Sequence, residues 1–229
     1  MSLLTVLNNS LTVRNPPAYT KENNFQRIFH MKNRCFSRHD SLSCDQYKLS
    51  NHAKDYLTNF YHILDQLIEG MDNASLNNSI SHNFIAQMIP HHEAAIEMSK
   101  NLLPHTTCIP LRNIAEQIIT EQTKSIEDMK QAECDCNKLL NSQRDVELYQ
   151  RKVWQIMNTM FTDMGNAPNE NQINADFIRE MSPHHMGAIY MSKNALKYDI
   201  CPELCPILLS IISSQERGVR QMQQLLRQL

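Results

Sequence analysis

The sequence predicts an all-α protein, a helical bundle made of two tandem three-helix repeats. Only 4 Gly and 9 Pro among 229 residues leave little turn chemistry for an all-β fold. Shifting the chain by 93 positions places FIAQMIPHHEAAIEMSKNLL (84–103) on FIREMSPHHMGAIYMSKNAL (177–196), without a gap. Residues 84–129 and 177–222 share 20 identities in 46 positions, so the chain carries an internal duplication.

Each repeat shows three segments with helical periodicity. The first is expected at 51–71 and again at 143–164, where Val153, Ile156, Met157 and Met160 recur at three- and four-residue steps. The second carries the Pro-His-His motif and is expected to end near residues 103 and 196. The third is expected at 109–139 and 203–228.

The connection between the repeats allows two interpretations. Neither Gly nor Pro occurs between Leu111 and Met164, so the repeats are joined by a tight turn near Asn141 or by one continuous helix. Ser142 is a candidate N-cap for the turn. The predicted organisation is a polar N-terminal extension at 1–48, a first repeat at 49–140 and a second repeat at 141–229.

The N-terminal extension lies outside the duplication. It is polar, carries Pro16-Pro17, and is expected to hold a short helix near 22–33. Cys35, His39 and Cys44 form either an accessory metal site or, as the favoured reading, a scattered set of surface residues.

Composition narrows the classes of partner. The 22 basic and 24 acidic residues give a net charge of −2, which argues against nucleic acid as a partner. No apolar run approaches the roughly 20 residues that a membrane span needs. The N-terminus makes a poor secretory signal and the seven cysteines are odd in number, so we expect a cytoplasmic protein. Self-association into a homo-oligomer stays open.

The second helix of each repeat carries the candidate metal ligands. On a helical wheel both His91 and His92 fall within about 60° of Met88, inside the apolar stripe. Two buried imidazoles are costly unless their nitrogens are satisfied. A metal ion bound by imidazole and thioether is one solution. The candidate ligands are the matched residues of the two repeats: Met88, His91, His92, Met98, Met181, His184, His185 and Met191.

A purely structural role is the alternative, with each histidine hydrogen-bonded inside the core and each methionine a packing residue. The surrounding sequence has diverged between the repeats, as at Glu93/Met186, whereas the Met and His residues match. Pro90 and Pro183 precede the His pairs. Each either kinks its helix, freeing the carbonyl of Ala86 or Arg179 to orient an imidazole, or marks the start of a new helix.

Ligand softness indicates copper. Di-iron bundles use Glu-x-x-His pairs, and no histidine in this chain has a Glu three residues before it. Met-x-x-His stands in that place twice, which favours Cu(I). Zinc is the alternative, through histidine and the matched cysteines Cys108 and Cys201. Cys134, Cys136 and Cys205 are further, weaker thiolate candidates.

Other methionines extend the candidate set. Met157, Met160 and Met164 share a face of the first helix of the second repeat and could meet the His cluster across the bundle. The first repeat keeps only Met71 at the matching positions. The second repeat therefore offers more thioether ligands for a soft metal ion. The matched pairs on the third helix, Gln122/Gln215 and Met129/Met222, are candidate supporting residues.

The segment Phe-Ile-x-x-Met-x-Pro-His-His-x-x-Ala-Ile-x-Met-Ser, followed by Ile-Ile-x-x-Gln and a later Met, resembles the ferritin-like family called domain of unknown function 305. The resemblance covers roughly 55–133 and 148–226. It implies a ferritin-like bundle and an association of some members with copper through His and Met. It implies no enzyme activity, and members are often exported.

Three functions compete on this evidence. The favoured one is a metal-binding protein that buffers or sequesters Cu(I), with one site per repeat. The second is a structural or interaction bundle without metal. The third, a metal-dependent oxidoreductase, is the least favoured because the sequence shows no nucleophile–base pair and no cofactor loop.

Overall fold

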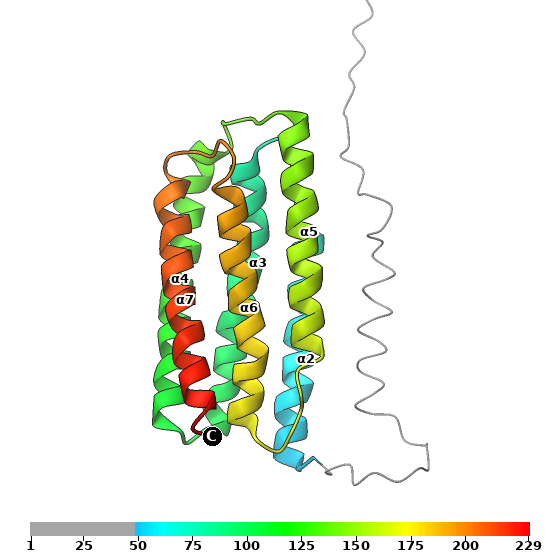
Figure 1. Cartoon of the computed structure of the whole chain (residues 1–229), viewed down its shortest axis with the longest axis vertical. Helices are drawn as coiled ribbons and strands as arrows, with labels where there is room; N and C mark the ends of the chain where they lie inside the picture. Colours follow the sequence, from blue (N-terminus) through cyan, green and yellow to red (C-terminus); the bar gives the residue numbers. More distant parts are fainter. Residues whose placement is uncertain (1–48) are drawn as a thin grey trace, which may run out of the picture.

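The computed structural model describes residues 49–229, which form an all-α fold (Figure 1). Its helices run alternately up and down, and one short 3₁₀ turn follows the second of them. In order they are α2 (Asn51–Asp72), α3 (Ile80–Leu102), η1 (Leu103–His105), α4 (Ile109–Cys136), α5 (Gln143–Gly165), α6 (Ile173–Ala195) and α7 (Leu204–Leu226).

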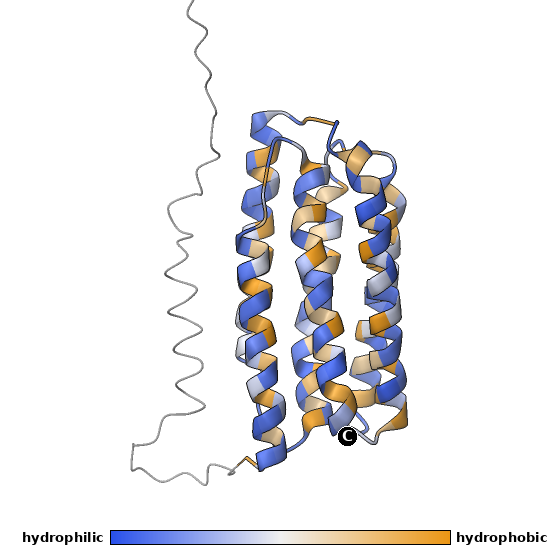
Figure 2. Cartoon of the chain, turned by 180° about the vertical axis from the view of Figure 1, so that it is seen from behind, coloured by the Kyte–Doolittle hydropathy of each residue, from blue (hydrophilic) through white to orange (hydrophobic). Residues whose placement is uncertain are grey.

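The helices form two groups that face each other. Helices α2, α3 and α4, here called the first unit, pack in chain order, and α5, α6 and α7, the second unit, do the same. Between the units α3 packs on α6, α4 on α7, and α2 on α5. The buried apolar residues of all these helices form one core cluster, and hydrophilic and hydrophobic residues alternate along each helix (Figure 2). Helices α3 and α6, which carry the His pairs, therefore occupy the centre.

Serine N-caps set several helix starts. The hydroxyls of Ser50, Ser79 and Ser142 accept hydrogen bonds from the backbone N–H groups of Ala53, His82 and Asp145. The cap at Ser142 is confirmed, and a turn joins the units in place of a continuous helix. Asn141 holds this turn, because its side chain accepts from the Ile80 N–H and its own N–H donates to the Asn78 carbonyl.

Both prolines lie inside helices, so the interpretation that a new helix starts at each one is wrong. Pro90 stands in the interior of α3 and Pro183 in the interior of α6. A proline here removes one backbone hydrogen bond, but both helices are packed on several sides and continue through it. Gly70 of α2 lies against Pro90 so closely that a Cβ at residue 70 would be 2.8 Å from the Pro90 Cβ.

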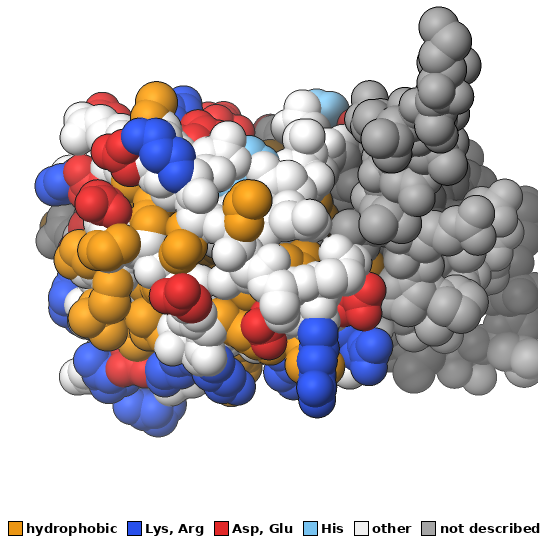
Figure 3. All heavy atoms as spheres, turned by 90° about the horizontal axis from the view of Figure 1, so that it is seen from above, with side chains coloured by type: hydrophobic (Ala, Val, Ile, Leu, Met, Phe, Trp, Pro, Cys, Tyr) orange, Lys and Arg blue, Asp and Glu red, His pale blue; other side chains and the backbone are white. Residues whose placement is uncertain are grey.

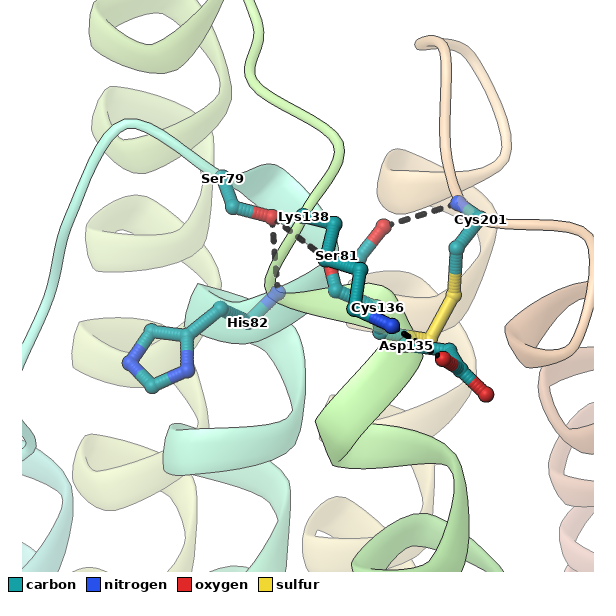
Figure 4. The surroundings of a disulfide bond; sticks show 7 residues. All are labelled: Ser79, Ser81, His82, Asp135, Cys136, Lys138 and Cys201. Atoms are coloured by element: carbon teal, nitrogen blue, oxygen red, sulfur yellow. Dashed lines mark hydrogen bonds and ion pairs between the residues drawn. A yellow bond between two sulfur atoms is a disulfide. The ribbon is translucent and has the colours of Figure 1, made fainter.

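A disulfide between Cys136 and Cys201 links the end of α4 to the segment before α7 (Figure 4). The Ser79 hydroxyl donates to the Cys136 carbonyl, and the Ser81 hydroxyl accepts from the Cys201 N–H. Cys108, predicted as the counterpart of Cys201 in a zinc site, is a free thiol instead. Disulfides persist mainly in oxidising compartments, and the cytoplasmic location stays a prediction.

The surface carries mixed charge. Viewed from the end at which α5 begins, charged and polar side chains surround an apolar cluster toward the α4 and α7 side (Figure 3). None of the helices in residues 49–229 has the length and apolar character to cross a membrane. The helix expected near 22–33 and the set Cys35, His39 and Cys44 lie outside the described residues.

Candidate metal centre

The eight predicted ligands all lie in the core of the bundle. Each is at most 2% exposed, and the set comprises Met88, His91, His92, Met98, Met181, His184, His185 and Met191. Because α3 faces α6, the two His pairs come from opposite sides of one interface. The structure thus brings the two sequence motifs together at the centre of the molecule.

One histidine of each pair, His91 and His184, forms an inner pair. Their ring centroids are 3.7 Å apart with a 37° angle between the planes. The Nε2 of His184 lies 3.1 Å from the His91 carbonyl oxygen. Since a carbonyl only accepts, this Nε2 carries the proton and the Nδ1 of neutral His184 holds a free lone pair.

Met160 of the second unit reaches the inner histidine of the first unit. Its sulfur lies 3.3 Å from the Nε2 of His91. Two neighbouring ligands of a tetrahedral ion with bonds of about 2.0–2.3 Å are roughly 3.5 Å apart. The nitrogen and the sulfur are therefore spaced as two ligands of one soft metal ion would be.

Glycine makes this contact possible. A Cβ on Gly187 of α6 would collide with the sulfur of Met160. The matching residue of the first unit is Ala94, and the residue that matches Met160 is Leu67. The first unit therefore has neither the sulfur nor the space for it. Nearby, Met157 accepts a long hydrogen bond from the Gln87 amide at 3.8 Å.

The other two histidines, His92 and His185, form an outer pair. Each ring centroid lies 6.0–6.2 Å from that of its inner neighbour. Both rings line a cleft of about 240 Å³ between α4 and α7. The Nε2 of His92 pairs with the Ser125 hydroxyl at 3.1 Å, whereas the Nε2 of His185 borders Gly218.

All four rings are held neutral and incompletely satisfied. Burial lowers the pKa of His92 to about 3 and that of His185 to about 4, and it lowers the pKa of both inner histidines well below the usual range. The Nδ1 atom of every one of the four is buried without a partner among the described residues. Neutral imidazoles with unused nitrogens are the form in which histidine binds metals.

The nitrogens do not converge on one point in this structure. Among residues 49–229, three His, Cys, Asp or Glu ligand atoms lie within 4.8 Å of one another only at Cys136, Cys201 and Glu203, where the two sulfurs are already bonded. The imidazoles also bond neither the Ala86 nor the Arg179 carbonyl, so that predicted orienting contact is wrong. Three of these histidines could bind one ion only after their rings rotate about the side-chain bonds.

A buried acidic group beside the cluster was missed by the sequence reasoning. Glu180 accepts a 2.6 Å hydrogen bond from the Tyr56 hydroxyl of the opposite unit. Burial raises the pKa of Glu180 well above its usual range and that of Asp176, one turn earlier, to about 7. The signal was available, because Glu180 directly precedes Met181 and falls near Met191 on the helical wheel.

A surface groove lies over the Met160 side of the centre. Its volume is about 970 Å³, and it runs between α5 and α6. Met160, Pro183, Gly187 and Tyr190 are among the residues that line it. Met160 is only 3% exposed, so its side chain forms part of the wall between the groove and His91.

The fold and the central cluster define a small helical-bundle protein with a buried histidine–methionine core. The family model for the domain of unknown function DUF305 matches residues 62–133 and 82–226, and the chain belongs to this family. A solved structure titled as a DUF305 fragment from Deinococcus radiodurans is 21% identical, covers 66% of this chain and 97% of its own, and has a TM-score of 0.49. The search of curated proteins gave no match.

Proposed function

We propose that this protein binds Cu(I) at a single centre between its two units and serves to buffer or sequester it. The observation that carries the proposal is the 3.3 Å approach of the Met160 sulfur to the Nε2 of His91 in a fully buried site. Imidazole with thioether is a soft ligand set that suits Cu(I) better than zinc or iron.

The contact between the inner rings supports one shared centre in place of one site per repeat. His91 and His184 stack at 3.7 Å, so two separate cations bound on these rings would be only a few ångströms apart. Their mutual repulsion in a buried site would be large. One ion bound by His91 and Met160, with His184 turning its free Nδ1 toward it, avoids this repulsion.

A metal-free structural bundle is the competing function. Such a bundle satisfies its buried polar atoms internally, because each buried group without a partner costs about 1–3 kcal/mol. Here four buried Nδ1 atoms have no partner in residues 49–229. That concentration of unused nitrogens on two facing helices supports a ligand role.

The groove over Met160 supplies a direction of entry. An ion arriving between α5 and α6 would meet the Met160 wall first and His91 behind it. Thioethers bind Cu(I) without losing a proton, so this first contact is independent of pH. The eight predicted residues then divide into an inner centre around His91 and His184 and an outer pair on the opposite side.

An anaerobic Cu(I) titration against a chromogenic chelator tests the proposal. We expect one tightly bound Cu(I) per chain in the wild type and at least about a hundredfold weaker binding (about 2.7 kcal/mol) in a His91→Ala/His184→Ala variant. Met160→Leu installs the residue of the first unit and should weaken binding at least about tenfold with little change in stability.

Met71→Leu is the matched control, since Met71 is a comparably buried methionine of α2, the helix that corresponds to α5 in the first unit. It should bind Cu(I) like the wild type. Equal affinity in the wild type and the double histidine variant would show that the inner pair does not bind copper. The structural bundle would then be the better account.

A further inference from the structure

We infer that the cleft between α4 and α7 is a second metal site, in which two imidazoles and two amide oxygens hold a divalent ion of the Zn(II) class. The imidazoles are those of the outer pair, His92 and His185, and the amides are those of Gln122 and Gln215. This inference does not rest on the copper proposal, because it uses different atoms on the opposite side of α3 and α6.

The cleft is built from matched residues of the two units. At the repeat offset, Gln122 matches Gln215, Ser125 matches Gly218 and His92 matches His185, and all six line the cleft. One member of each pair therefore approaches from each unit. An ion between them would meet two equivalent ligand sets.

Both amides are buried and incompletely satisfied. Gln122 is 4% exposed and Gln215 is 3% exposed, and the Oε1 of each has no hydrogen-bond partner among the described residues. A half-turn of the terminal amide exchanges its oxygen and nitrogen at almost no steric cost. A bound cation would give each oxygen the partner that it lacks.

The Nε2 edges of the two outer imidazoles face the two helices that border the cleft. His92 directs Nε2 at Ser125 of α4, and His185 directs the same edge at Gly218 of α7. A Cβ on residue 218 would lie 3.1 Å from the His185 Nε2. Because residue 218 is glycine, the Nε2 of His185 has no hydroxyl partner like the Ser125 hydroxyl that pairs with the Nε2 of His92.

The lining selects the class of ion. No Met or Cys is among the lining residues of this cleft, so a soft Cu(I) ion finds no sulfur there. Imidazole nitrogen suits borderline divalent ions such as Zn(II), and the two amide oxygens are the further neutral donors that the cleft offers. The two carboxylates that line the cleft each pair with a basic side chain, Glu121 with Arg217 at 2.6 Å and Asp128 with Lys124 at 2.7 Å. The neutral donors of the cleft are the ones left to bind an ion.

Calorimetric titration with Zn(II) tests the site, after alkylation of accessible thiols, and Co(II) absorption reports the coordination. We expect one Zn(II) per chain, and at least about tenfold weaker binding (about 1.4 kcal/mol) in a His92→Ala/His185→Ala variant, with the Co(II) bands lost. Cu(I) affinity measured on the same variant should stay within about threefold of the wild type.

Two exchange variants test the asymmetry without removing a histidine. Gly218→Ser gives His185 the hydroxyl partner of the first unit and should weaken Zn(II) binding, whereas Ser125→Gly frees the His92 Nε2 and should strengthen it. The inference is overturned if the wild type binds no Zn(II) at micromolar concentrations or if these variants all bind alike. It is also overturned if His92→Ala/His185→Ala loses Cu(I) together with Zn(II), because the outer pair would then belong to the copper centre.

Discussion

The first and second units have matching helices, but two buried polar residues that are amides in the first unit are carboxylic acids in the second. Where the first unit places the amides of Asn83 and Gln87, the second places the carboxyls of Asp176 and Glu180. Asn83 accepts from the Asn77 N–H at 2.8 Å, and Asp176 accepts from the matching Glu170 N–H at 3.2 Å. The same contact is therefore made once by a neutral group and once by an ionisable one.

The two units also differ in how closely the first helix packs on the second. In the first unit Gly70 lets α2 lie close to Pro90, whereas the second unit has Asp163 at the matching position beside a groove between α5 and α6. The second unit also supplies Met160 and the glycines that border Met160 and His185. The first unit is therefore closely packed at Gly70, whereas the second unit has a groove and a methionine–histidine contact on the matching side.

The largest expected effect concerns the bond that joins the units. Cys136→Ser should lower the free energy of unfolding by about 4 kcal/mol, because the disulfide spans 65 residues of chain. Chemical denaturation without and with reductant measures this loss, and the reductant should not destabilise the variant further. Cys108→Ser is the control and should change little, since Cys108 is a free thiol. Equal stability of wild type and Cys136→Ser would contradict a bond between Cys136 and Cys201.

The buried carboxyls should give the next largest effect. Burial raises the pKa of both carboxyls in the folded state, that of Asp176 to about 7. The contribution of Asp176 to stability is therefore full below about pH 4 and is lost as the pH rises through about 7, and that of Glu180 is also lost as the pH rises. Asp176→Asn/Glu180→Gln restores the amides of the first unit and should stabilise the protein at pH 8 by roughly 2 kcal/mol or more. Urea unfolding at pH 5 and pH 8 measures it.

The gain should shrink at the lower pH, where the wild-type carboxyls are largely protonated. The reverse exchange, Asn83→Asp/Gln87→Glu, should introduce the same pH dependence into the first unit. A gain in stability that is identical at both pH values would show that the carboxyls are not the titrating groups.

The smallest expected effect concerns the contact between α2 and Pro90. Gly70→Ala places a methyl group against a rigid ring and should cost about 1 kcal/mol after the gain in helix propensity. Asp163→Ala, at the matching position, should change stability by less than about 0.5 kcal/mol. Thermal unfolding of the two variants compares them directly. A stabilising Gly70→Ala would mean that α2 can move away from α3 without loss.

Much of the fold could be predicted because it follows from local pattern. Helix starts at Asn51, Ile109 and Gln143 agree with the expected ranges, since apolar periodicity acts over a few residues, as do the serine caps before Asn51 and Gln143. The ends were less accurate, as at Cys136 where 139 was expected, because the last turn depends on contacts with other helices. Whether Pro90 and Pro183 lie inside a helix or start one could not be predicted either, because contacts with other helices decide whether a helix continues through a proline.

Some features of the candidate site could likewise be predicted from the sequence, and others could not. The wheel positions of His91 and His92 predicted burial, and the duplication predicted that each unit carries a pair. The sequence also predicted that Met160 or a neighbouring methionine could meet the His cluster. That Met160 meets His91 of the other unit, and that Cys136 bonds Cys201, had no local signal. The repeat alignment compares equivalent residues, whereas these contacts join non-equivalent ones.

The sequence by itself determined the helices, the duplication and the burial of the two His pairs, because spacing along a helix sets which side chains share a face. Only the tertiary structure decided that the inner rings stack across α3 and α6, that the outer rings line the cleft between α4 and α7, and that the two faces differ in their neighbours. The reason is physical. Adjacent histidines point about 100° apart on a helix, so the helices that pack around them decide which sulfur, hydroxyl or amide each ring meets.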